Sequence, residues 1–380
     1  MDPTPEPRSP THASLDALPD RLAIEQVYTL LQRCFAPKPP PDCQVIPLLG
    51  DASDRRYYRL RFASPVDGIA SLVLMRLTQP HPERELPFVN VQRYLAMKGI
   101  PVPQIFCDDA AHGFVLLEDL GDITLEAALQ DATREQLSVW YREALDILLA
   151  LQHPEAPAPR HSCVAFQLAF DVEKFMSELD FFITYMLKGL CGRRLTSTDE
   201  AVLRGQFWKI SARLAREPRV LTHRDYHCRN LMLQGGRLRL IDFQDARLGP
   251  CHYDLASLLN DSYVALDSEV REQLLTYYLD WKARAEGHAV DRVAFLQVFD
   301  YMCLQRNLKA LGTFAYQAVV KRNSRYGTAM PRTLMYIQRN LAQHPELQPL
   351  RDLLEAHVFA ALPAALPTAG RHTLDTFPAR

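Results

Sequence analysis

The chain has 380 residues, of which 43 are basic and 45 acidic, so its formal net charge is −2, and 48% of its residues are hydrophobic. This balance excludes a protein that coats nucleic acid or docks on a membrane surface through charge, and no apolar run approaches the roughly 18 residues that a membrane span needs. The eight cysteines are scattered without a C-x-x-C pair, which argues against a zinc site or a disulfide scaffold and favours a reducing cytoplasm.

The first part of the chain predicts a small β-rich lobe. Residues 1–20 are rich in proline and are expected to form a disordered tail. Apolar periodicity and turn residues then delimit short elements. These are a helix over 21–34, strands within 45–76 (notably 57–62 and 72–75), a helix over 84–97 and a strand over 114–117. The last strand ends in a polar segment at 118–121, where we expect a hinge.

Beyond Gly121 the sequence predicts helices almost throughout, because apolar residues recur with helical spacing. The long patterns cover 172–189, 197–216, 252–263, 268–285 and 291–316. The predicted fold is therefore α+β, with a small β-rich N-terminal nucleotide-binding lobe over 21–120. A larger α-helical lobe with catalytic and substrate-binding residues is expected over 121–362, followed by a loose tail over 363–380.

One segment carries the main chemical signal. A histidine, Asp225 and Asn230 form an H-x-D-x-x-x-x-N loop, and Asp242 follows further on. Kinase-like enzymes use this order and spacing for phosphoryl transfer, which predicts a two-lobed protein-kinase-like fold. Asp225 is predicted to be the catalytic base for the attacking hydroxyl. Asn230 and Asp242 are predicted to hold Mg²⁺ ions that bridge the phosphates of ATP.

The spacing between these residues is consistent with one site. Apolar runs at 231–233 and 238–241 are separated by Gln-Gly-Gly-Arg, which predicts a β-hairpin. The hairpin would return Asp242 to the neighbourhood of Asn230. The alternative, a chance H-x-D near an amide and an acid, does not account for the hairpin.

Phosphate contacts are predicted on the turn at 50–57 of the N-terminal lobe. This turn offers backbone N–H groups, the Ser53 hydroxyl and the guanidinium groups of Arg55 and Arg56, and such groups bind phosphate well. Ser53 and Arg55 are the favoured nucleotide contacts. The alternative is an ordinary charged hairpin.

A second nucleotide contact is predicted at the end of the next strand. Kinase-like lobes place a lysine on their third strand, but here the cation is Arg76. Arg76 either takes the role of that lysine or is a surface charge, because the planar guanidinium is no neutral replacement for an ammonium. Its acidic partner would be Glu83 or Glu85.

The hinge and the helical lobe supply the remaining candidates. By their position after the strand, Glu118 and Leu120 are expected where a kinase linker offers its backbone to adenine; the alternative is a polar strand end. Asp254 opens an amphipathic helix and is predicted to accept hydrogen bonds from the catalytic-loop backbone, with the helix dipole as the alternative reason for an acid there. His223 is predicted to support the loop structurally.

Three further residues are candidates for substrate binding. His227 and Arg229 lie inside the loop beside Asp225. Arg306 shares a helix face with Lys309, three residues further along. This face is either solvated or turned toward the cleft, and in the second case Arg306 could bind a carboxylate or sugar oxygens.

The assembled pattern resembles the aminoglycoside phosphotransferase and choline kinase superfamily, and within it the bacterial kinases that phosphorylate N-acetylmuramate and N-acetylglucosamine at the anomeric carbon during cell-wall recycling. The residues that carry the resemblance span about 46 to 340. They are Gly50-Asp51-Ala52-Ser53 with Arg55-Arg56-Tyr57, Leu116–Asp122, His223–His227 with Arg229–Met232, Asp242–Ala246 with Gly249-Pro250 and Tyr253-Asp254-Leu255, and Leu304-Gln305-Arg306 with Leu308-Lys309.

The resemblance implies an ATP-dependent kinase of cell-wall amino sugars, with Asp225 as base, Mg²⁺ as metal and ATP as co-substrate. An anomeric hydroxyl is more acidic than an ordinary alcohol, so a carboxylate base suffices. Arg306 is the candidate for the lactyl carboxylate of N-acetylmuramate. A cytoplasmic monomer that binds neither nucleic acid nor membrane is expected.

Two other functions stay open at this point. The acceptor could be an aminoglycoside, choline or another small alcohol. A polycationic aminoglycoside would need an acidic acceptor site, to which Asp180, Glu178 and Asp261 could contribute. The third hypothesis is a nucleotide-binding module without catalysis, which loss of Asp225, Asn230 or Asp242 would favour; all three are present.

Overall fold

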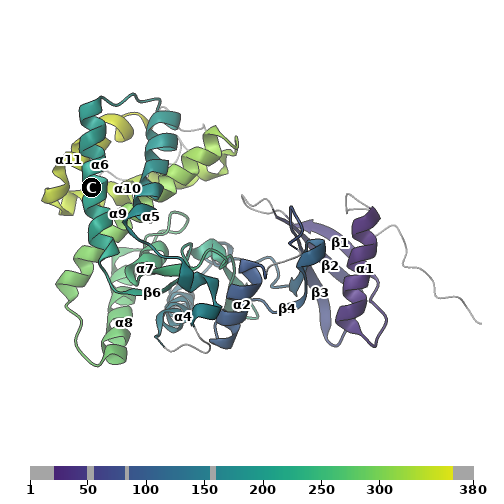
Figure 1. Cartoon of the computed structure of the whole chain (residues 1–380). Helices are drawn as coiled ribbons and strands as arrows, with labels where there is room; N and C mark the ends of the chain where they lie inside the picture. The colour runs from purple at the N-terminus through teal and green to yellow at the C-terminus, as the bar shows by residue number, and fades with distance from the viewer. Residues whose placement is uncertain (1–20, 49–54, 82–84, 155–159, 363–380) are drawn as a thin grey trace, which may run out of the picture.

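The computed structural model describes residues 21–48, 55–81, 85–154 and 160–362. Figure 1 shows two lobes, a small one built around a sheet and a larger helical one. The predicted α+β class, with a small β-rich lobe and a larger helical one, is therefore confirmed.

The small lobe contains a five-stranded antiparallel sheet in the order β1-β2-β3-β5-β4. Its strands are β1 Cys43–Leu48, β2 Arg56–Val66, β3 Ile69–Arg76, β4 Ile105–Asp109 and β5 Phe114–Glu118. Helix α1 (Arg21–Phe35) packs on one face, where Val27, Leu30 and Leu31 join Leu72 and Leu74 in a separate small core. Strand β4 was not predicted from the sequence.

The other face of the sheet meets the main core of the protein. Helix α2 (Pro87–Met97) begins at a proline, which suits a first helical position because its missing N–H needs no partner there; the predicted start at 84 was therefore too early. Val91 of α2, Met75 of β3 and Leu117 of β5 all belong to one continuous core that extends into the helical lobe. The two lobes are thus joined by packing as well as by the hinge.

The large lobe is mostly helical, as predicted. Its helices are α3 Leu125–Ala128, α4 Arg134–Gln152, α5 Val172–Phe182, which continues as a π-helix over Ile183–Leu190, α6 Ser197–Ala215, α7 His252–Leu259, α8 Ser268–Glu286, α9 Arg292–Val319, α10 Met330–Gln343 and α11 Gln348–Leu354. No helix in the described part of the chain is long and apolar enough to cross a membrane.

Two small strand pairs hold the catalytic segment, which is the stretch from His223 to Asp242. Strand β6 (Arg219–Thr222) pairs with β9 (Arg247–Pro250), and β7 (Leu231–Gln234) pairs with β8 (Arg237–Leu240). The second pair is the predicted hairpin, whereas the first was not predicted. Because β6 and β9 are paired, the two ends of the chain between them lie side by side. This pairing restricts where the catalytic segment can lie.

Helix α7 ends at Leu259, so the prediction of a helix to 263 was wrong. The reason is local: Asp261 accepts hydrogen bonds from the backbone N–H groups of Tyr263 (2.8 Å) and Cys228 (2.9 Å). A short acidic side chain that bonds nearby backbone competes with helix continuation. The resulting turn places residues 260–263 at the wall of the central cavity.

Helix α9 approaches α5 closely at Gly312. A Cβ atom at Gly312 would lie 2.8 Å from the Cα of Phe182, a distance that real Cβ atoms do not adopt. The glycine therefore permits the backbone contact between the helices. This contact fixes the position of α9, whose residues line the cavity.

Candidate active site

A cavity of about 830 Å³ lies between the lobes and is lined by both of them. The N-terminal lobe contributes Arg55, Tyr57, Arg59 and Val73, and the hinge contributes residues 117–122. The helical lobe contributes the catalytic segment, the end of α7 and one face of α9. A space of this size and composition is suited to two small ligands side by side.

The catalytic loop begins directly after β6 and is anchored by Asp254. The two carboxylate oxygens of this fully buried side chain accept hydrogen bonds from the backbone N–H groups of His223 (2.6 Å) and Arg224 (2.9 Å). Arg224 has φ of +85°, a strained conformation for a side chain of this size. Asp254 therefore holds the backbone immediately before Asp225.

His223 and Tyr226 hold the loop from other sides. The His223 imidazole Nε2 lies 2.9 Å from the carbonyl oxygen of Ile241, which joins the loop to the end of the hairpin. The Tyr226 hydroxyl donates to the carbonyl of Ala144 on α4 (2.7 Å). Both contacts are structural in kind, which is the role proposed for His223.

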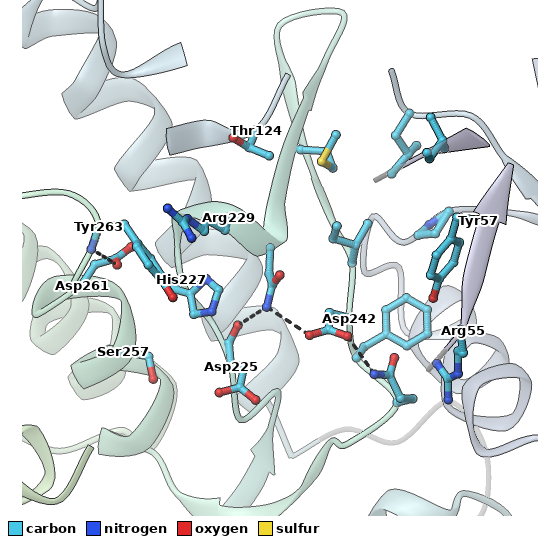
Figure 2. Close-up of a pocket in the computed structure, with 18 of the residues that line it drawn as sticks. Arg55, Tyr57, Thr124, Asp225, His227, Arg229, Asp242, Ser257, Asp261 and Tyr263 are labelled. Atoms are coloured by element: carbon cyan, nitrogen blue, oxygen red, sulfur yellow. Dashed lines mark hydrogen bonds between the residues drawn. The ribbon is translucent and has the colours of Figure 1, made fainter. Parts of the chain in front are cut away.

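Asp225, Asn230 and Asp242 come together at the cavity wall, where Figure 2 shows Asp225 and Asp242. The Asn230 amide donates to the carbonyl of Asp225 at 2.8 Å and lies 3.4 Å from the carboxylate of Asp242. The N–H of Ile241 donates to the carbonyl of Asn230 (3.0 Å), so the hairpin closes the group. Asp242 has φ of +65°, which turns its side chain out of the strand direction.

Asn230 and Asp242 fit a hard divalent cation. They offer one amide and one carboxylate, and Asp242 is oriented by a hydrogen bond from the Gln244 amide (2.8 Å). Mg²⁺ is commonly held by one or two such oxygen ligands, with the remaining positions taken by substrate phosphates and water. The donor set therefore matches a metal that binds together with a nucleotide.

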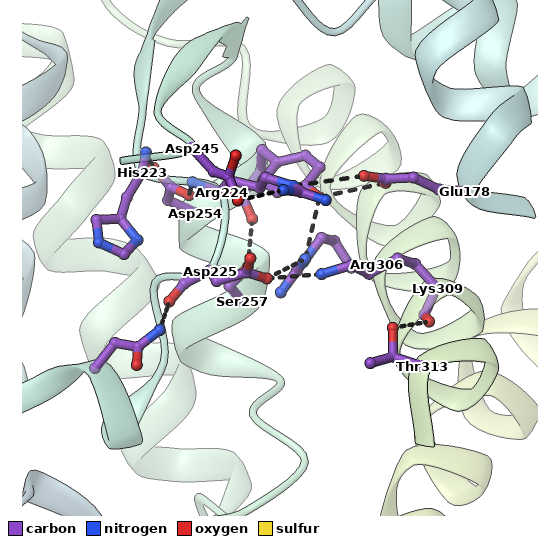
Figure 3. A network of polar contacts seen from close by, with 12 residues as sticks. Glu178, His223, Arg224, Asp225, Asp245, Asp254, Ser257, Arg306, Lys309 and Thr313 are labelled. Atoms are coloured by element: carbon purple, nitrogen blue, oxygen red, sulfur yellow. Dashed lines mark hydrogen bonds and ion pairs between the residues drawn. The ribbon is translucent and has the colours of Figure 1, made fainter. Parts of the chain in front are cut away.

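Two cations of α9 contact the carboxylate of Asp225 (Figure 3). The Lys309 ammonium lies 2.6 Å and the Arg306 guanidinium 3.5 Å from the same oxygen, Oδ1. Burial alone would raise the pKa of Asp225, but the charges of Lys309, Arg306 and Arg224 outweigh it and hold the pKa well below its ordinary value. The α9 cation pair, Arg306 and Lys309, thus keeps Asp225 ionised.

The α9 face that carries this pair turns inward, toward the cavity. Lys309 was not among the predicted site residues, although its spacing from Arg306 was a usable signal. Asn307 on the same helix also lines the cavity and was not predicted. The residue is only 3% exposed, and its side-chain amide nitrogen has no partner in the described structure.

The two cations predicted to contact the nucleotide from the N-terminal lobe, Arg55 and Arg76, differ in whether they reach the cavity. Arg55 and Tyr57 line the cavity, near Asp242 in Figure 2. Arg76 is not among the described residues that line it. Side chains alternate along β3: Val73 lines the cavity, whereas Leu72 and Leu74, which share a face with Arg76, pack in the core beneath α1.

The acidic partner considered for Arg76 is Glu83 or Glu85. Glu85 pairs with Arg93 and with the Asn90 amide (2.7 Å) of α2, so Arg76 does not take it as a partner. Ser53 and Glu83 lie outside the described residues.

At the hinge, Glu118 and Leu120 both line the cavity. The N–H of Glu118 already donates to the carbonyl of Gln104 (2.8 Å), and its carboxylate pairs with Arg239 of β8 (2.6 Å). Of the two predicted adenine contacts, Leu120 is therefore the one whose backbone N–H the geometry favours.

An ion-pair network at the hinge was not predicted from the sequence. Arg59 of β2 binds the carboxylate of Asp119 at 2.7 and 3.0 Å and that of Asp122 at 2.8 and 2.9 Å. The Ser71 hydroxyl also donates to Asp119 (2.6 Å). Since Arg59 belongs to the sheet and Arg239 to the helical lobe, the hinge is tied to both lobes.

The two loop residues predicted to bind substrate have different surroundings. Arg229 makes a two-pronged ion pair with Glu126 (2.7 and 2.9 Å), and its guanidinium lies 3.6 Å from the ring centre of Tyr263. Its charge is therefore compensated within the protein. His227 lines the cavity, and burial lowers its pKa to about 3, which leaves the imidazole neutral with Nδ1 unpartnered in the described structure.

The acids considered for a polycationic acceptor do not come together at the cavity. Asp180 pairs with Arg204, and neither Asp180 nor Glu178 is among the described residues that line the cavity. Asp261 lines it, but its carboxylate already accepts two backbone hydrogen bonds. The charges that face Asp225 from α9 are instead positive.

Comparison with known proteins agrees with this geometry. The model of the family described as "Phosphotransferase enzyme family" matches residues 44–288. The N-acetylmuramate/N-acetylglucosamine kinase of Neisseria meningitidis is 34% identical over 80% of this chain and 87% of its own length. The protein of the same name from Pseudomonas aeruginosa is 35% identical over 83% of this chain and 88% of its own.

Solved structures show the same fold. The ADP-bound aminoglycoside phosphotransferase APH(2'')-Ib matches with a TM-score of 0.53 and 17% identity, over 82% of this chain and 96% of that one. The choline kinase LicA of Streptococcus pneumoniae matches with a TM-score of 0.55 and 16% identity, over 85% and 99%. With the catalytic segment and the family match together, the predicted superfamily and enzyme class are confirmed: the chain belongs to the phosphotransferase enzyme family and is a kinase that uses ATP.

Proposed function

We propose that this protein transfers the γ-phosphoryl group of ATP to the anomeric hydroxyl of N-acetylmuramate or N-acetylglucosamine. The observation that carries the choice of acceptor is the α9 cation pair beside Asp225. A site with positive charge at the base disfavours a polycationic aminoglycoside and suits a neutral or acidic sugar. The names of the relatives, at 34% and 35% identity, support the same acceptor.

In this proposal one part of the cavity accepts the proton of the sugar and the other binds ATP. Asp225 accepts the proton of the sugar hydroxyl, a contribution that is typically worth about 10²–10⁴ in rate. Arg55 contacts the phosphates from the small lobe, and the backbone of Leu120 receives the adenine. Positioning of the two substrates supplies most of the remaining acceleration.

We propose Mg²⁺ as the divalent ion, held by Asn230 and Asp242. When bound, it would neutralise charge on the phosphates. Asn230 is also held by its hydrogen bond to the carbonyl of Asp225, so the metal-binding and proton-accepting residues keep a fixed mutual position. We propose that the protein acts as a monomer in the cytoplasm, where ATP is supplied.

The acceptor is tested with a panel of N-acetylmuramate, N-acetylglucosamine and kanamycin, in which ADP release is coupled to NADH oxidation. Phosphorus NMR of the product distinguishes an anomeric phosphate from a phosphate on any other hydroxyl. We expect turnover of one or both amino sugars, with phosphate on the anomeric oxygen. Turnover confined to kanamycin would refute the proposal.

The role of Asp225 is tested with Asp225→Asn. This variant keeps the shape of the side chain but removes the proton acceptor. We expect ATP binding, measured by calorimetry, to be retained and turnover to fall by about 10²-fold or more. Unchanged turnover would refute the assignment of Asp225 as the base.

A further inference from the structure

The acceptor side of the cavity contains more hydrogen-bond donors than the protein satisfies. The Lys309 ammonium has three N–H donors, and one of them donates to Asp225. Arg306, only 8% exposed, has an Nε without a partner in the described structure, and so does the amide nitrogen of Asn307. All three residues line the cavity. A ligand that satisfies them must bring acceptor oxygens.

The same region carries surplus positive charge. Arg306 and Lys309 together bring two positive charges, of which Asp225 balances one. Arg224 does not alter this count, because it pairs with Asp245 (2.9 Å), and the charge of the neighbouring Glu178 is balanced by Lys174 (3.8 Å). Among the residues that the structure describes here, one positive charge is thus left for a ligand to neutralise.

We propose that Arg306, Asn307 and Lys309 form a carboxylate-binding site beside the catalytic base, and that Lys309 makes the enzyme prefer acceptor sugars that carry an acidic group. This inference rests on the proposed function and specifies which of its two sugars the site is built to recognise. A carboxylate carries one negative charge and only accepts hydrogen bonds, so it matches both the surplus charge and the unsatisfied donors.

The chemistry of the acceptor agrees with this placement. In N-acetylmuramate the lactyl carboxylate is attached to the same ring as the anomeric hydroxyl, one carbon beyond the acetamido carbon. With Lys309 only 2.6 Å from Asp225 Oδ1, a sugar whose anomeric hydroxyl reaches Asp225 has its lactyl group within range of the α9 cation pair. Binding the carboxylate there would also orient the hydroxyl toward the base.

The test compares three acceptors: N-acetylmuramate, its lactyl methyl ester and N-acetylglucosamine. The first two differ in charge, so the ratio of their kcat/KM values measures recognition of the carboxylate. Any effect of Lys309 on Asp225 itself acts on all three acceptors and cancels in this ratio. We expect the wild-type ratio of acid to ester to be about tenfold or more, as for a charge-assisted contact.

Lys309→Gln should lower this ratio to near one, whereas Lys309→Arg keeps the charge and should retain most of it. Lys321→Gln, which changes an exposed lysine just beyond the end of α9, is the matched control and should leave the ratio unchanged. Calorimetric titration of the acid and the ester into wild type and Lys309→Gln gives the same comparison without turnover.

The outcomes separate this inference from the proposed function. If Lys309→Gln slows all three acceptors by one common factor, Lys309 serves only Asp225 and the inference is overturned while the function stands. A wild-type enzyme that uses acid and ester equally well also overturns the inference alone. If the wild type phosphorylates none of the three, the proposed function itself fails. Should Lys309→Gln not fold, Asn307→Ala must lower the acid-to-ester ratio; an unchanged ratio overturns the inference.

Discussion

The contact between Asp254 and the catalytic loop predicts a large and measurable loss of stability. In Asp254→Ala the backbone N–H groups of His223 and Arg224 lose the acceptors that now lie at 2.6 and 2.9 Å. A buried donor left unsatisfied costs about 1–3 kcal/mol, so the two together cost about 2–6 kcal/mol. Burial raises the pKa of Asp254, and removal of this buried carboxyl group recovers part of the loss. We therefore expect about 2–4 kcal/mol.

The same change should reduce turnover beyond its effect on stability. Arg224 keeps its φ of +85° while its N–H is held by Asp254, and Asp225 follows directly. If the loop relaxes, the base moves, and a displacement of about 1 Å can cost about 10²-fold in rate. The assay is urea unfolding followed by tryptophan fluorescence, together with kcat at saturating ATP and acceptor.

Asp171→Ala is the matched control for Asp254→Ala. Asp171 also accepts a backbone hydrogen bond at a helix start, from Lys174 (2.7 Å), but it is exposed and lies outside the cavity lining. The loss of such a cap costs about 1 kcal/mol, and kcat should not change. If Asp254→Ala loses no more stability than Asp171→Ala and keeps its kcat, the anchoring role is refuted.

Two further predictions concern nucleotide binding and pH. Arg55→Ala should raise the KM for ATP about tenfold or more by removing a charged phosphate contact, whereas Arg76→Ala should leave it nearly unchanged; equal effects in ATP titrations would contradict the assignment of the two sheet faces. Burial lowers the pKa of His252 from 6.5 to about 3, so only the unfolded state takes up this proton as the pH falls below 6.5. The resulting loss of stability is about 2 kcal/mol at pH 5. His252→Leu removes only this contribution, so it should lose about 2 kcal/mol less than the wild type between pH 7.5 and 5; equal changes of the two proteins in urea unfolding would contradict the prediction.

The catalytic segment could be predicted from the sequence because its information is local. The hairpin depends on two short apolar runs and a glycine turn between them, and it alone determines that Asp242 returns to Asn230. The link to Asp254 is a contact across 30 residues of chain. It was predictable only because an acid at the start of a helix can accept hydrogen bonds from the backbone N–H groups of a neighbouring loop.

The orientation of Arg76 could not be predicted, for a reason that lies in the packing of β3. A strand with one buried face shows alternating polar and apolar residues, which reveal its inward side. Leu72, Leu74 and Met75 are all buried because the sheet has a core on each face. Without alternation, the sequence does not indicate on which face Arg76 falls.

The inward orientation of Lys309 could not be predicted because α9 is buried on most of its surface. Fifteen of its 28 residues are buried, so a polar residue in the pattern does not mark a solvated face. Only the tertiary contact at Gly312, where α9 meets the backbone of Phe182, determines which side turns toward Asp225.

The α9 cation pair also has a consequence for the kind of hydroxyl that Asp225 can serve. A carboxylate whose pKa is held well below its ordinary value is always ionised at neutral pH, but it is a weak proton acceptor. Such a base works best with a hydroxyl that releases its proton readily or does so late in phosphoryl transfer. The anomeric hydroxyl of a sugar is more acidic than an ordinary alcohol. The electrostatics of Asp225 and the charge preference of the acceptor site therefore favour the same substrate, although they act on different atoms of it.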